Sequence, residues 1–89
     1  MTAEELKRRI ETGLPGATVL VSTPDETHFE AVVVAQQFAG RRSVQRHQLV
    51  YSALGAVVGR EVHALSLAVH TPEEWAALPK PKSGAGSGR

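Results

Sequence analysis

Two stretches decide the fold: Val44-Gln45-Arg46-His47-Gln48-Leu49-Val50-Tyr51-Ser52-Ala53-Leu54 and Glu61-Val62-His63-Ala64-Leu65-Ser66-Leu67. In the first stretch, apolar residues recur three and four positions apart, which is typical of one face of a helix. In the second, larger and smaller side chains alternate, as they do along a strand with two different faces. We therefore expect a helix followed by a strand, and an upstream region that gives both elements something to pack on.

The predicted helix has one apolar face, made of residues that are three or four positions apart: Val44, His47, Tyr51, Leu54 and Val58. His47 falls within this face, so we interpret it as a packed residue that bonds a backbone carbonyl. Ser43 precedes the helix and is the expected N-cap. Gly55 and Gly59 interrupt or end the segment, which indicates a kinked helix or a helix–turn–helix. In the following strand, the side with small residues suits close helix packing.

The upstream region predicts a helix and a β-hairpin. Thr2-Ala3-Glu4-Glu5 has the form of a capping box, which marks a helix start, and Gly13 and Pro15 end that helix. Residues 17–21 and 28–35 are rich in valine and predict two strands. The intervening residues include Pro24 and Asp25, which favour a turn. The valine run of the second strand indicates a central strand that is covered on both faces.

The C-terminal part predicts a last short helix and a tail. Thr71-Pro72-Glu73-Glu74 is a second capping box with proline at the first helical position, and Trp75 follows within that helix. Residues 79–89 contain no apolar residue larger than alanine, so we expect a disordered tail after a domain at residues 1–78. The order αββααβα predicts an α+β sandwich, in which helices cover one face of a three-stranded mixed sheet.

Composition narrows the class of protein. A chain of 89 residues suffices for one small domain, and its formal charge of +1 gives no strong global field. No apolar run approaches the roughly 20 residues of a membrane-spanning helix, and the N-terminal residues carry no secretory signal, so we expect a cytoplasmic protein. The chain has no cysteine, so histidines and carboxylates are its metal ligands. No nucleophile motif or catalytic carboxylate pair stands out, which argues against an enzyme.

Five motifs, taken together and in order, resemble the BolA family. They are His28-Phe29 at the start of the valine-rich strand, Phe38-Ala39-Gly40, Arg46-His47-Gln48-Leu49-Val50-Tyr51 closed by Leu54, His63-Ala64-Leu65-Ser66-Leu67, and Thr71-Pro72-Glu73-Glu74-Trp75. The resemblance runs from about residue 2 to residue 75. It implies a fold similar to class II KH domains, which agrees with the element order derived from the residues.

The resemblance also implies a function. BolA-like proteins are adaptors, not enzymes, that pair with a monothiol glutaredoxin and share a [2Fe-2S] cluster in iron–sulfur homeostasis, redox regulation and stress response. The glutaredoxin and a glutathione supply thiolates, and the BolA-like chain supplies the histidine of its His-Ala-Leu strand, here His63. Relatives often add a cysteine or histidine from the loop before the His-Phe pair. Residues 23–27 contain neither, so His28 or, less favourably, Asp25 would be the second ligand.

A DNA-binding transcriptional regulator is the alternative. Arg41, Arg42 and Arg46 flank the start of the predicted helix–turn–helix, and some BolA-like proteins are described as transcription regulators. Against this, Gly40-Arg41-Arg42-Ser43 lacks the second glycine of the G-x-x-G loop in KH domains, and three arginines give little counterion release. The same arginines would otherwise face an acidic patch on a protein partner. An interaction module without metal and a weak homodimer also stay open.

Overall fold

The computed structural model describes residues 1–55 and 64–78 of the chain. The elements are, in order, α1 (Ala3–Gly13), β1 (Thr18–Ser22), β2 (His28–Val34), the 3₁₀-helix η1 (Gln36–Phe38), α2 (Ser43–Leu54), β3 (Ala64–His70) and α3 (Pro72–Ala77). The strands form one sheet in the order β1-β2-β3, with β1 antiparallel and β3 parallel to β2. The predicted α+β fold with a three-stranded mixed sheet is confirmed.

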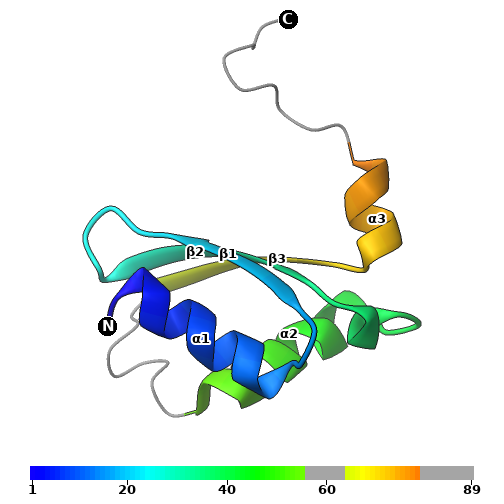
Figure 1. The fold of residues 1–89 in the computed structure, drawn as a ribbon, viewed down its shortest axis with the longest axis horizontal. Helices are drawn as coiled ribbons and strands as arrows, with labels where there is room; N and C mark the ends of the chain where they lie inside the picture. The colour runs from blue at the N-terminus through cyan, green and yellow to red at the C-terminus, as the bar shows by residue number, and fades with distance from the viewer. Residues whose placement is uncertain (56–63, 79–89) are drawn as a thin grey trace, which may run out of the picture.

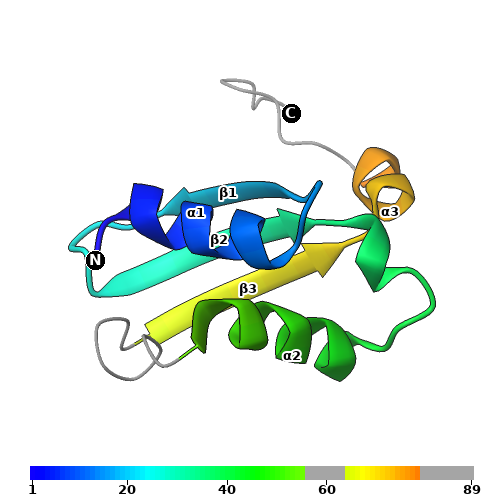
Figure 2. The same cartoon turned by 60° about the horizontal axis from the view of Figure 1, so that its bottom comes forward.

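Helices α1 and α2 lie side by side on one face of the sheet, and α3 lies beyond the end at which β3 finishes (Figures 1 and 2). The parallel pairing of β2 and β3 requires a crossover, which contains α2. In the register, His28 is opposite Ala64 and Val34 is opposite His70. The starts of β2 and β3 therefore share one end of the sheet.

The core lies between the two helices and the sheet. It consists of buried residues from α1, α2, η1 and the helix-facing side of the strands: Leu6, Ile10, Leu14, Val19, Phe29, Val33, Ala35, Phe38, Val50 and Leu54. Both predicted capping boxes are present, at Thr2 with Glu5 and at Thr71 with Glu74. Helix α1 ends at Gly13, where a Cβ atom would collide with Ala53 of α2. Glycine at this position therefore allows the close approach of the two helices.

The buried face of α2 differs from the predicted one. Val44 and Tyr51 are 62% and 39% exposed, whereas Val50 and Leu54 are buried. The sheet packs against the face that carries Val50 and Leu54, and this tertiary contact overrides the apolar spacing read from the sequence. His47 is half-buried, and its ring makes no hydrogen bond to a described residue, in contrast to the predicted bond to a backbone carbonyl.

Three further predictions need correction or stay open. Ser43 is not the N-cap of α2: Arg42 takes that place, and its backbone N–H donates to Oε1 of Gln45 at 3.0 Å. The connection before α2 contains the 3₁₀-helix, which buries Phe38. The predicted helical segment after Gly55 and the predicted tail at residues 79–89 lie outside the described residues.

Among the described helices, none combines the length and the apolar character that crossing a membrane requires.

Candidate functional site

The end of the sheet where β2 and β3 begin carries one candidate metal ligand, His28. His28 is the first residue of β2, and its register partner Ala64 is the first residue of β3. The side chain of His28 is 65% exposed. His63 precedes Ala64 in the sequence but lies outside the described residues, so its role as a ligand stays a prediction.

The loop before β2 is built around Asp25. One carboxylate oxygen of Asp25, Oδ1, accepts the backbone N–H groups of Thr27 and His28, both at 2.9 Å. The Oγ1 of Thr23 donates to the His28 carbonyl at 2.6 Å and accepts the N–H of Glu26 at 2.9 Å. Side-chain oxygens thus satisfy the backbone groups of this loop, as is typical of turns that contain aspartate and threonine.

The second carboxylate oxygen of Asp25, Oδ2, lies 2.8 Å from Nδ1 of His28. The backbone N–H of His28, then its ring, then the N–H of Thr27 lower the pKa of Asp25 to about 2. Asp25 is therefore ionised at neutral pH. Because an ionised carboxylate only accepts hydrogen bonds, the ring must donate from Nδ1.

The arginines that were predicted to form one partner surface have different environments. Arg46 makes a two-pronged ion pair with Glu74 of α3, at 2.7 and 3.0 Å, and its Nε donates to the Arg41 carbonyl at 3.0 Å. Its side chain is only 14% exposed, and its guanidinium lies 5.9 Å from the centre of the Phe38 ring. Arg46 therefore connects α2 to α3 and is not a free surface cation.

The ion pair shifts the pKa values of both partners away from neutrality. The guanidinium of Arg46 and the backbone N–H of Thr71 lower the pKa of Glu74 to about 2, and Glu74 raises the pKa of Arg46. Arg41 donates its Nε to the Gln37 carbonyl at 3.0 Å. Arg42 is exposed, and its guanidinium has no partner among the described residues. Two of the three arginines thus remain at the surface.

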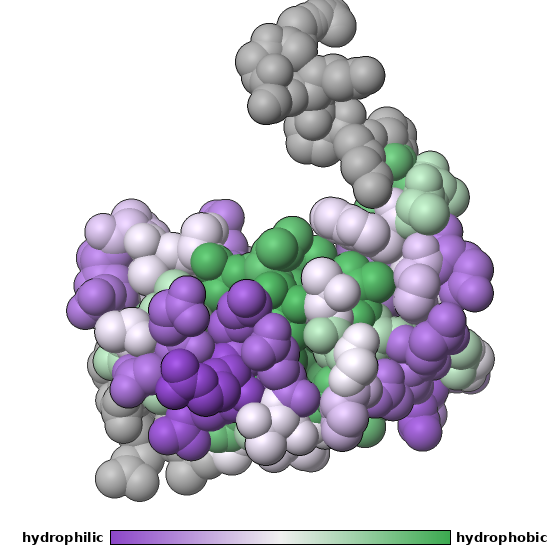
Figure 3. All heavy atoms as spheres, viewed as in Figure 1, coloured by the Kyte–Doolittle hydropathy of each residue, from purple (hydrophilic) through white to green (hydrophobic). Residues whose placement is uncertain are grey.

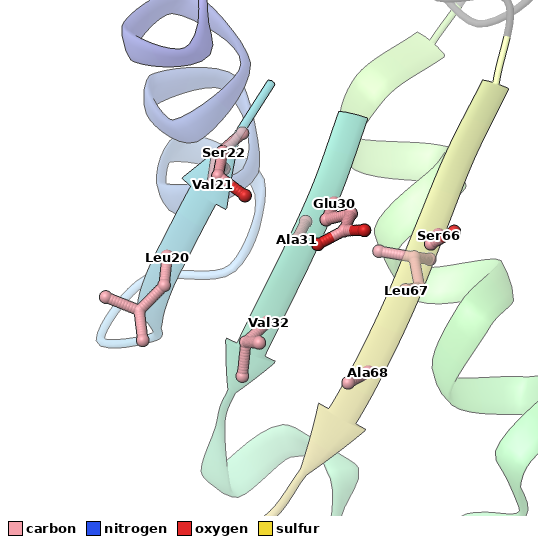
Figure 4. Close-up of a pocket in the computed structure, with 9 residues that line it drawn as sticks. All are labelled: Leu20, Val21, Ser22, Glu30, Ala31, Val32, Ser66, Leu67 and Ala68. Carbon is pink, nitrogen blue, oxygen red and sulfur yellow. The ribbon is translucent and has the colours of Figure 1, made fainter. Parts of the chain in front are cut away.

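Figure 3 shows hydrophobic residues gathered over the strands, on the side of the sheet away from α1 and α2. A shallow hollow of about 340 Å³ lies across the three strands on this face. Leu20, Glu30, Val32, Ser66 and Ala68 are among its lining residues (Figure 4). The small residues of β3 therefore lie on the open face, and the prediction that they pack against helices is wrong, since Leu65, Leu67 and Val69 pack on the core.

The described residues do not make up a complete metal site. Within residues 1–55 and 64–78, no three histidine, cysteine, aspartate or glutamate side chains come together. The Asp25–His28 pair offers one accessible imidazole, which suits iron or zinc. Any thiolate in such a site would have to come from another molecule, because this chain has no cysteine.

Comparison with known proteins points to one family. The sequence pattern of the BolA-like protein family matches residues 9–74. A Haemophilus influenzae relative, named DNA-binding transcriptional regulator BolA, is 43% identical over 68 residues, which are 72% of this chain and 66% of that protein. Human BolA-like protein 1 is 39% identical over 75 residues, 84% of this chain and 52% of that protein. This chain thus spans between about half and two thirds of these relatives.

The fold comparison agrees. A solved structure of a BolA homologue from Coxiella burnetii superposes with a TM-score of 0.77 at 43% identity, over 85% of this chain and 97% of that chain. These relatives are named as regulators or as BolA-like proteins.

Proposed function

This chain belongs to the BolA-like protein family, and on that premise we propose that it is an adaptor that pairs with a monothiol glutaredoxin and shares a [2Fe-2S] cluster with it. The observation that carries the proposal is the exposed imidazole of His28 at the end of the sheet where β3 also begins. Imidazole is an established ligand for iron in such clusters.

The ligand set is consistent with a shared cluster. His63 is the sequence neighbour of Ala64, which is the register partner of His28. Because consecutive Cα atoms are about 3.8 Å apart, a direct sequence neighbour of Ala64 is a reasonable candidate to share a cluster with His28. The remaining ligands would be thiolates of the glutaredoxin and of glutathione. When bound, the cluster would supply one-electron redox chemistry, with a potential that histidine ligation raises.

Reconstitution of the mixed complex tests this function. The chain, a monothiol glutaredoxin, glutathione, iron and sulfide are combined, and visible absorption and circular dichroism are recorded. We expect a spectrum of the mixed complex that His63→Ala abolishes and His28→Ala alters. His47→Ala, on α2, is the matched control and should leave the spectrum unchanged. An unchanged spectrum with His63→Ala would refute the ligand assignment, and equal glutaredoxin binding without iron and glutathione would favour the metal-free module.

DNA binding is the second candidate, because a relative is named as a DNA-binding transcriptional regulator. Arg41 and Arg42 are exposed at the entry to α2, where a phosphate backbone could reach them. If both contact phosphates, Arg41→Ala with Arg42→Ala should reduce the salt dependence of binding to duplex DNA by about 1.8 logarithmic units per decade of salt. Fluorescence anisotropy at several salt concentrations measures this slope. Absence of binding, or a slope that the two substitutions leave unchanged, would remove this candidate.

A further inference from the structure

We propose that Asp25 is a positioning residue that holds the ring proton of His28 on Nδ1 and thereby presents Nε2 as the metal-binding atom. The identity of the metal, the iron of a shared cluster, rests on the proposed function. The placement of the proton does not, since it depends only on contacts within this chain.

The carboxylate of Asp25 has a fixed orientation. Its Oδ1 accepts two backbone N–H groups, from Thr27 and His28, so the carboxylate cannot turn without losing both bonds. This orientation places Oδ2 at 2.8 Å from Nδ1 of the His28 ring. A neutral imidazole carries one proton, and a carboxylate that only accepts requires that proton on Nδ1. Nε2 then carries the free lone pair.

The ring is placed for an external metal. The side chain of His28 is 65% exposed, so Nε2 is accessible although Nδ1 is bonded. Metal-binding histidines commonly donate their other ring N–H to a carboxylate, which fixes the tautomer and makes the ligand nitrogen more basic. The Asp25–His28 pair has this arrangement before any metal binds. The loop residues 23–27 therefore contribute by orienting the ligand, although they contain no histidine or cysteine themselves.

Asp25→Asn separates this role from a role in loop structure. The two backbone N–H groups require the amide oxygen at the position of Oδ1, so the amide NH₂ would face Nδ1 of His28. An NH₂ group only donates, which makes Nδ1 the acceptor and moves the ring proton to Nε2. The loop keeps its backbone bonds while the tautomer inverts. Glu26→Gln is the matched control, because Glu26 lies in the same loop and its side chain has no partner among the described residues.

The first measurement uses the free protein. Nitrogen-15 NMR of the histidine rings at about pH 8, where imidazole is neutral, distinguishes protonated from unprotonated ring nitrogens. We expect protonated Nδ1 and unprotonated Nε2 for His28 in the unmodified chain and in Glu26→Gln, and the reverse in Asp25→Asn. Protonated Nε2 in the unmodified chain would overturn the proposal. This first observation needs no variant, so a folding defect in Asp25→Asn would not leave the proposal undecided.

The second measurement uses the mixed complex with glutaredoxin. Loss of such an orienting carboxylate typically weakens metal binding about 10- to 100-fold, so iron should leave the Asp25→Asn complex at least about tenfold faster when a chelator is added. Glu26→Gln should match the unmodified complex. If the tautomer is as expected but no cluster forms, the proposed function fails and the positioning role stands. If a cluster forms and Asp25→Asn matches Glu26→Gln in both measurements, the positioning role fails.

Discussion

The two ends of the sheet use an ionised carboxylate in the same way but with opposite results. At the end where β2 and β3 finish, the Glu74 carboxylate accepts the backbone N–H of Thr71 and binds Arg46, whose side chain is only 14% exposed. At the end where they begin, Asp25 accepts backbone N–H groups and binds His28, whose side chain is 65% exposed. Both carboxylates have a pKa of about 2. One end thus uses its charges within the fold, and the other leaves a side chain available to a partner.

Phe38→Ala should be the most damaging change at the Arg46 end. Phe38 is fully buried and lies beneath the Arg46 guanidinium, so its removal leaves a cavity and costs about 3–5 kcal/mol of unfolding free energy. Val44→Ala, on the exposed side of α2, should change stability by no more than about 0.5 kcal/mol. Urea denaturation of both variants measures the difference. A loss below about 1 kcal/mol for Phe38→Ala would show that this end is less tightly packed than described.

Arg46→Gln should lower the melting temperature more than Arg42→Gln, although less than Phe38→Ala. The first substitution removes both bonds to Glu74, whereas the Arg42 guanidinium has no partner among the described residues. In a double-mutant cycle with Glu74→Gln, the two losses should be less than additive, because they remove the same interaction. Additive losses of stability, or equal melting temperatures for Arg46→Gln and Arg42→Gln, would contradict an ion pair between Arg46 and Glu74 that stabilises the fold.

Lowering the pH should remove the stability that the carboxylates contribute at both ends of the sheet. The folded-state pKa values of Asp25 and Glu74 are lowered from 3.8 and 4.5 to about 2, so each carboxylate stabilises the fold above its unfolded pKa. That contribution is lost as pH falls from about 4.5 towards 2. Glu74→Gln should therefore reduce the fall in melting temperature across this range, and Glu73→Gln, an exposed neighbour, should not. Calorimetry at several pH values measures how steeply the melting temperature falls with pH. Equal steepness in Glu74→Gln and Glu73→Gln would show that the Glu74 carboxylate does not cause the fall.

Sequence reasoning worked best where the structure depends on neighbours in the chain. The capping boxes at Thr2 and Thr71 need partners three residues away, and the structure contains both. The Asp25–His28 contact has the same spacing, so the position of an aspartate three residues before the candidate ligand was a readable signal. An aspartate in a turn is equally consistent with a turn former, a direct ligand and a partner of the ring, so the spacing alone does not decide among these roles.

The predictions that failed concern features that depend on tertiary contacts. Arg46 and Glu74 are 28 residues apart, and no local pattern shows that α3 brings them together. Arg46 therefore looked like part of an exposed basic cluster. The face of α2 was misassigned for a related reason: Leu54 belongs to both candidate apolar faces, and only the sheet determines that Val50, not Tyr51, is buried beside it. The BolA-like motifs predicted the fold correctly because they extend over nearly the whole described chain.

His28→Ala should reduce stability less than Phe38→Ala or Arg46→Gln, and it should have the clearest effect on partner chemistry. Because both side chains of this pair are exposed to solvent, the pair contributes little to stability, so thermal unfolding should be close to that of the unmodified chain. The loop should persist, because Asp25 still accepts the N–H groups of Thr27 and of the substituted residue 28. Thermal unfolding and reconstitution with glutaredoxin, measured on the same preparation, separate the two effects. A large loss of stability would mean that the ring serves the fold, as Arg46 does at the other end. An almost unchanged stability with an altered cluster spectrum would mean that the exposed ring serves a partner.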